Sequence, residues 1–127
     1  MKSLVVIDTN VIIRYLLADH QEHFEKARSF WEKVKLGEIA AFIPESVLAE
    51  SVYVLLKIYG VPKGEVVVKL SRLLDYKGLT GELDVYREAL KIFGRKSIDV
   101  VDAIILAWAK VKDYKPISFD KDISKVI

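Results

Sequence analysis

The residues of this chain best suited to chemistry are carboxylates that stand in otherwise apolar stretches. An isolated buried carboxylate costs several kcal/mol, so it normally becomes neutral or takes a partner. The nearest cations on the same predicted helices, Lys57 and Lys110, are about two turns away from the acids there. A hard divalent cation would resolve this difficulty, because it prefers oxygen ligands. The acids concerned are Asp8, Glu50, Asp102 and Asp120.

Each acid also has an ordinary structural interpretation. Asp8 can cap the helix that follows it, and Asp120 stands in a turn, where Asp is common. Asp102 could be satisfied by backbone groups or a distant Lys, and Glu50 could lie on a partly exposed helix face. Asp99 shares a helical face with Asp102, and it is either a fifth acid near the site or a helix N-cap. The occurrence of all four acids in one chain favours a shared metal site.

The other polar candidates are weaker. Asn10 and Ser118 could donate hydrogen bonds to carboxylates, with helix capping as the alternative for Asn10. His20 and His23 stand three residues apart beside Asp19, but a solvated helix start explains them better than a metal site does. Cys is absent, which excludes thiolate nucleophiles and Cys-based zinc sites and makes the cytoplasm the natural compartment.

Short apolar runs that alternate with helical patterns predict the elements that would position these acids. The predicted strands are Leu4–Ile7, Ile39–Ile43, a segment near Gly78–Thr80, and Lys115–Phe119. The predicted helices run from Val11 to about Ala18, over 24–34, from Pro44 to Gly60, over 62–74, over 83–93 and over 99–108. This order predicts a three-layer α/β/α sandwich with a central, mainly parallel sheet. The first strand should be central and buried on both faces, so that Asp8 ends it where α/β sheets place ligand sites.

The composition predicts one globular domain over residues 1–127. The chain is 52% hydrophobic and 30% charged, which is too apolar for a disordered chain. No apolar run approaches the ~20 residues of a membrane span, and the first residues lack a signal-peptide pattern. The net charge is +2, and discounting four metal-neutralised acids leaves a more positive remainder that could bind a phosphate backbone.

Four segments, taken in order, resemble the PIN-domain family, and within it the VapC-type ribonuclease toxins of toxin–antitoxin systems. They are VVIDTNVIIRYL around Asp8, VLAESVYVL around Glu50, IDVVDAIILA around Asp99 and Asp102, and ISFDKD around Asp120 and Asp122. The resemblance implies that Asp8, Glu50, Asp102 and Asp120 are the catalytic acids that hold Mg²⁺ or Mn²⁺. It also implies supporting positions at Asn10, Asp99, Ser118 and Asp122.

The same resemblance implies a metal-dependent endoribonuclease that hydrolyses phosphodiester bonds in structured RNA such as tRNA or ribosomal RNA. It further implies a VapB-type antitoxin as protein partner, and a homodimer. One or two bound metal ions can activate water and stabilise charge without a protein nucleophile, which suits a chain lacking Cys.

Two alternatives remain open. A housekeeping or degenerate PIN module would share the resemblance, and the degenerate form would bind RNA or partners without cleavage. A receiver-type phospho-Asp signalling domain has a similar length and a Lys-Pro pair, which Lys115-Pro116 imitates. Against the receiver, the first predicted strand ends in one acid rather than two adjacent ones, and Lys115 begins the last strand instead of ending it.

Overall fold

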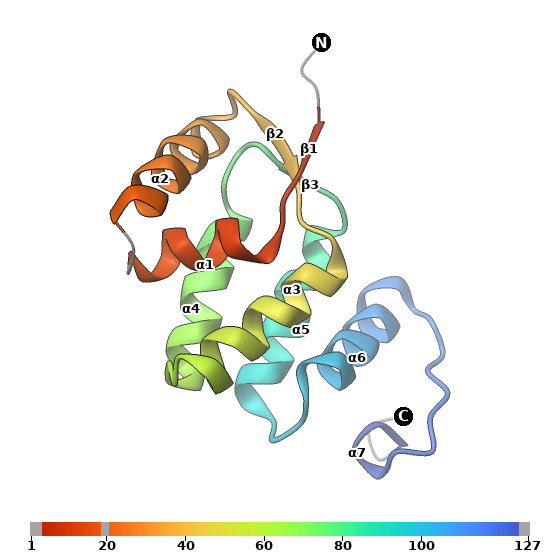
Figure 1. The fold of residues 1–127 in the computed structure, drawn as a ribbon. Helices are drawn as coiled ribbons and strands as arrows, with labels where there is room; N and C mark the ends of the chain where they lie inside the picture. Colours follow the sequence, from red (N-terminus) through yellow and green to blue (C-terminus); the bar gives the residue numbers. More distant parts are fainter. Residues whose placement is uncertain (1–3, 19–20, 125–127) are drawn as a thin grey trace. The chain divides into compact units, whose positions relative to one another are not determined.

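A computed structural model describes residues 4–18 and 21–124, and the chain divides into two compact units after Gly81 (Figure 1). The first unit contains β1 (Leu4–Val6), α1 (Thr9–Leu17), α2 (Gln21–Leu36), β2 (Ala40–Phe42), α3 (Glu45–Tyr53), the π-helical segment η1 (Val54–Ile58), α4 (Lys63–Leu74) and β3 (Leu79–Thr80). The second unit contains α5 (Leu83–Arg95), α6 (Val100–Lys112) and α7 (Lys121–Ser124).

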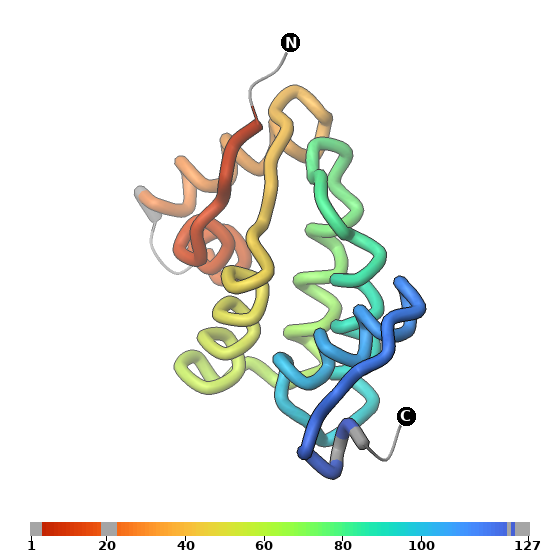
Figure 2. The backbone as a smooth tube through the Cα atoms, turned by 90° about the vertical axis from the view of Figure 1, so that its right-hand side faces the viewer, coloured from red at the N-terminus to blue at the C-terminus, as the bar shows by residue number. Residues whose placement is uncertain are grey.

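The strands form a parallel sheet in the order β1-β2-β3. Val5 pairs with Ala41, which in turn pairs with Leu79. Figure 2 shows β1 and β2 running alongside each other. Helices separate the strands along the chain, as parallel pairing requires. The predicted α/β class, its parallel sheet and the strand near Gly78–Thr80 are therefore confirmed.

The first strand differs from the prediction, because it is neither central nor buried on both faces. β2 pairs with a strand on each side, and its Ala41 is fully buried. β1 lies at an edge, and Leu4 and Val6 are 55% and 65% exposed. Within the predicted run, Ile7 is the residue that reaches the core, at 2% exposure. A continuous apolar run fits an edge strand as well as a central one, so the sequence pattern alone misplaced it.

The predicted last strand, Lys115–Phe119, is not formed. The described segment between α6 and α7 has no strand pairing, and Ile117 and Phe119 are almost fully exposed. The helix before it ends where Asp113 takes a left-handed conformation, with φ of 56°. A strand exists only where another backbone accepts its hydrogen bonds, so the short sequence pattern here was an insufficient signal.

An aromatic cluster forms part of the core of the first unit. The ring of Trp31, which is fully buried, stacks on Tyr15 at 5.6 Å and meets Tyr76 edge-on at 5.9 Å. The hydroxyls of Tyr15 and Tyr76 lie 2.6 Å apart, and the pKa of Tyr76 is raised, first by burial and then by this bond. The cluster therefore ties α1 and α2 to the turn that leads into β3.

Two helical predictions of the first unit need adjustment. The helix predicted from Pro44 to Gly60 is α3 followed by η1, with Pro44 as its N-cap and Gly60 beyond its end at φ of 65°. The helix predicted from Val11 begins two residues earlier, at Thr9. The remaining predicted helices correspond to α2, α4, α5 and α6, with shifts of a few residues at their ends.

The second unit is built on α5 packed against α6. Leu90 of α5 and Ala103 and Ala107 of α6 are fully buried. At the surface of the pair, the Lys110 ammonium lies 3.1 Å from the Glu88 carboxylate. Across both described ranges, no helix is sufficiently long and apolar to cross a membrane.

Candidate functional site

Asp8 stands between β1 and α1, and it is the N-cap of the helix. Its backbone is extended, at φ −97° and ψ 171°, and its Oδ1 accepts a hydrogen bond from the Val11 amide at 3.2 Å. Asp is among the residues preferred at this position. The structural interpretation of Asp8 is thus confirmed, and Asn10 lies inside the helix rather than at its N-cap. The Asp8 side chain remains exposed, so capping leaves it accessible to a ligand.

Thr9 is a residue that the sequence interpretation missed. Its side chain is buried, and its hydroxyl donates a hydrogen bond to Oε1 of Glu50 on α3. Thr9 directly follows Asp8, so this bond brings Glu50 to the same end of α1. The available signal was a small hydroxyl residue beside an acid at a strand-to-helix junction.

The first unit therefore brings two of the four predicted acids into one neighbourhood. The hydrogen bonds described above involve one oxygen of each carboxylate, while an ionised carboxylate offers about four lone-pair sites. Carboxylate and hydroxyl oxygens are the donors that Mg²⁺ and Mn²⁺ prefer, so the chemistry of Asp8, Thr9 and Glu50 fits such an ion. Among its described residues, neither unit contains by itself a group of three His, Asp or Glu able to hold a metal.

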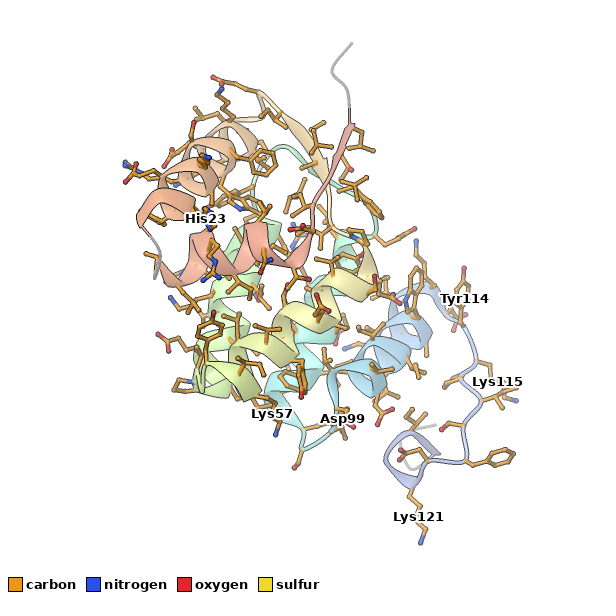
Figure 3. The ribbon with its side chains drawn as sticks, viewed as in Figure 1. His23, Lys57, Asp99, Tyr114, Lys115 and Lys121 are labelled. Atoms are coloured by element: carbon orange, nitrogen blue, oxygen red, sulfur yellow. The ribbon has the colours of Figure 1, made fainter. Side chains whose placement is uncertain are left out.

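A cavity of about 420 Å³ adjoins Asp8 within the first unit. Asn10 lines it beside Asp8, which is consistent with a supporting role for that amide. Three basic residues also line it, Arg14 from α1 and His23 and Lys26 from α2. Figure 3 shows His23 on α2. The other residues that line the cavity are apolar, so Asp8, Arg14 and Lys26 supply its charged groups, and the two cations suit an anionic ligand such as a phosphodiester.

In the second unit, two of the predicted acids lie at the start of α6. Asp99 is its N-cap residue, with an extended backbone, but its side chain makes no capping hydrogen bond. Figure 3 shows Asp99 in the loop that leads into α6. Asp102 lies in the first turn and is half-buried. Acids are favourable there because the amino end of a helix carries partial positive charge. Asp99 therefore stands at the N-cap position with a carboxylate that is not used for capping.

Asp120 follows the unpaired segment that precedes α7, and its side chain is exposed. Its backbone amide donates to Oγ of Ser118 at 2.9 Å, which makes a local turn. Ser118 thus accepts a bond from the backbone, and its hydroxyl proton can still donate to a carboxylate, so the predicted supporting role stays a prediction. Asp122 lies in α7, but its side chain is outside those described, and His20 lies outside the described residues altogether.

Comparison with protein families gives one match, the PIN domain, over residues 5–127. PIN domains are typically nucleases, and PIN nucleases generally use divalent metals. No curated protein and no solved structure matches the chain. The match runs through both units and includes every predicted acid, and it does not support the receiver-type alternative. The chain therefore belongs to the PIN-domain family.

Proposed function

We propose that this chain is a divalent-metal-dependent endoribonuclease and that it serves as the toxin of a VapBC-type toxin–antitoxin pair. One observation carries the proposal: the family match extends over residues 5–127 and so contains the whole set of acids, Asp8, Glu50, Asp102 and Asp120. The nuclease assignment follows the family, and the toxin assignment follows the resemblance of the four acidic segments to VapC-type proteins.

In this proposal, Asp8, Glu50, Asp102 and Asp120 would hold Mg²⁺ or Mn²⁺, with Asp99 and Asp122 as further acids nearby. When bound, the ion supplies an activated water and neutralises charge that develops on the phosphate. The carboxylate oxygens of Asp8 and Glu50, which the first unit brings into one neighbourhood through Thr9, support this ligand set.

The chain's own residues orient the acids and attract the substrate. The Thr9 hydroxyl restricts the rotamer of Glu50, and the first-turn amide of Val11 holds Asp8. Outer hydrogen bonds of this kind commonly tune metal ligands. Arg14 and Lys26 line the cavity beside Asp8, where they would attract an RNA phosphate toward the acids.

The proposed partners are structured RNA as substrate, a VapB-type antitoxin and a second copy of the chain. The antitoxin would inhibit by covering the acids of the proposed site with an inserted segment and excluding RNA. A neighbouring reading frame that encodes a small DNA-binding protein, whose product binds this chain and stops RNA cleavage, would support the toxin assignment. A chain that cleaves RNA but has no such neighbour would instead be a housekeeping PIN nuclease.

RNA cleavage tests the nuclease assignment. Purified protein is incubated with tRNA or ribosomal RNA in Mg²⁺, in Mn²⁺ and in chelator, and the products are resolved on a denaturing gel. We expect internal cleavage that requires the metal and is lost in Asp8→Asn. The matched control is Asp84→Asn, which removes an 83%-exposed acid paired with Arg87.

Two results would contradict the nuclease assignment. Equal cleavage by the native chain and Asp8→Asn would identify a contaminating nuclease. Tight RNA binding without cleavage in either metal would favour the degenerate PIN module.

A further inference from the structure

A stacked pair of aromatic rings lies at the carboxyl end of α6. The ring centroids of Trp108 and Tyr114 are 6.2 Å apart, and the ring planes differ by 2°. Asp113, the C-cap in left-handed conformation, turns the chain so that Tyr114 lies back along the helix. Trp108 is half-buried, whereas Tyr114 is 61% exposed. The pair is thus fixed on its inner side and accessible on its outer side.

Two lysines flank this pair. Lys112 forms an ion pair with Glu82 at 2.7 Å, and its pKa is raised mainly by that bond, with a smaller electrostatic contribution from Tyr114. Lys115 directly follows Tyr114 and is exposed. Figure 3 shows Tyr114 and Lys115 next to each other in the segment that leaves α6. Because exposed ion pairs contribute little, Lys112 can exchange Glu82 for a phosphate at small cost.

We propose that Trp108 and Tyr114 form a stacking platform for an unpaired base of RNA, and that Lys112 and Lys115 contact the adjoining phosphates. The inference rests on the proposed function, since it concerns how the same RNA substrate is held. Every base has a face that can stack on an aromatic ring, whereas bases inside a duplex are already stacked on each other. The platform therefore selects single-stranded regions of RNA with little sequence preference.

The geometry of the pair favours this occupant. Two rings already stacked in parallel present a flat surface to which a base can add in the same orientation. Stacking on Trp108 also restricts Tyr114 before the ligand arrives, which lowers the entropy lost on binding. The ammonium of Lys115, and that of Lys112 once it leaves Glu82, would then suit the phosphates on either side of the base.

Tryptophan fluorescence gives a direct readout. The chain has two tryptophans, and Trp31 is fully buried, so quenching by an added ligand reports contact near Trp108. The titration uses the full chain in chelator, which prevents cleavage, with a 12-nucleotide poly(A) strand and with a 12-base-pair RNA duplex. We expect quenching and clearly tighter binding with the single strand.

Substitutions separate stacking from general charge attraction. Tyr114→Ala should weaken single-strand binding about tenfold, whereas Tyr114→Phe should bind nearly as the native chain does. Tyr59→Ala, at a 42%-exposed tyrosine of the first unit, is the matched control and should leave the affinity for the single strand unchanged. Lys115→Gln should lower the slope of log affinity against log salt by about 0.7. If Tyr114→Ala fails to fold, the quenching of Trp108 and the salt dependence of binding by Lys115→Gln still test the platform.

Unchanged single-strand binding by Tyr114→Ala, absence of quenching, or equal binding of duplex and single strand would overturn the platform. Its failure is distinguishable from failure of the proposed function. A chain that binds the strand as described but never cleaves RNA retains the platform and loses the nuclease assignment. A chain that cleaves RNA with the same KM in the native form and in Tyr114→Ala retains the nuclease assignment and loses the platform.

Discussion

At the scale of single residues, the hydroxyl of Thr9 is the group that links the two acids of the first unit. It donates to Glu50 while its own backbone lies next to Asp8. Buried beneath two exposed carboxylates, Thr9 supports Glu50 without needing to contact a ligand itself. It is therefore a positioning residue in the proposed site.

Replacement of Thr9 tests this role. Thr9→Val keeps the branched shape but removes the donor, so Glu50 would lose its fixed orientation and Mn²⁺ affinity should fall about 10- to 100-fold. Thr9→Ser keeps the hydroxyl and should retain most of the affinity. The Mn²⁺ affinity of each variant is measured by titration, with the concentration of free ion monitored by electron spin resonance. Equal Mn²⁺ affinities of Thr9→Val and Thr9→Ser would show that the hydrogen bond from Thr9 to Glu50 does not orient a metal ligand.

The sequence suggested the residue types of the candidate site but not the contacts between them. Acids in apolar stretches of the sequence drew attention to Asp8 and Glu50, but both residues are exposed in the structure, so the expected cost of burying a carboxylate does not apply to them. Thr9 was missed, because its partner lies 41 residues away and no local pattern reveals such a pairing. The turn bond that Ser118 accepts was likewise not predicted, and it leaves the hydroxyl proton able to donate to a carboxylate.

At the scale of elements, Asp8 serves both α1 and the proposed metal site, and substitutions can separate the two roles. Asp8→Asn keeps a capping oxygen, so the free energy of unfolding should be nearly unchanged. Asp8→Ala removes the cap and should lower that free energy by about 0.5–2 kcal/mol. Both variants should lose RNA cleavage. Urea unfolding followed by circular dichroism measures stability, and equal stability of the two variants would mean that the cap contributes nothing.

Gly78 has no space for a side chain at the point where the chain enters β3. A Cβ there would lie 2.0 Å from the Ile39 carbonyl oxygen and 2.9 Å from that of Val34. The Gly78 backbone also bonds Val34 and Ala41, at 2.8 Å each. Gly78→Ala should therefore separate β3 from β2 and lower the free energy of unfolding by at least about 3 kcal/mol.

Gly64 supplies the matched control for that substitution. It lies in the first turn of α4, and a Cβ there would meet nothing within 4 Å. Gly64→Ala should be neutral or raise the free energy of unfolding by up to about 1 kcal/mol. Similar losses of stability in the two variants, measured in the same urea titration, would contradict the steric explanation for Gly78.

The elements were predictable to different degrees. Helical spacing of apolar residues located α2 and α4–α6, because one face of each helix packs against a core. Strand patterns were less informative. Leu4–Ile7 is a continuous apolar run and Lys115–Phe119 holds two large apolar residues, yet the first segment forms an edge strand and the second forms none. An apolar run indicates that side chains can be buried, but it does not identify the backbone that would pair with it.

At the scale of the whole molecule, each unit has a core of its own, and the proposed ligands are divided between them. Asp8 and Glu50 belong to the first unit, and Asp102 and Asp120 belong to the second. Four carboxylates that share one divalent ion would stabilise the folded chain by binding only its native form. Metal binding by the full chain should accordingly depend on acids from both units.

Manganese uptake by four forms of the full chain tests that central claim most directly. Free Mn²⁺ is measured by electron spin resonance during titration of the native chain, Asp8→Asn, Asp120→Asn and the control Asp84→Asn. The proposed site predicts tight uptake by the native chain and by Asp84→Asn, and affinity at least about tenfold weaker in the two other variants. Native affinity in Asp120→Asn, or no uptake by the native chain, would contradict a metal site shared by the four acids.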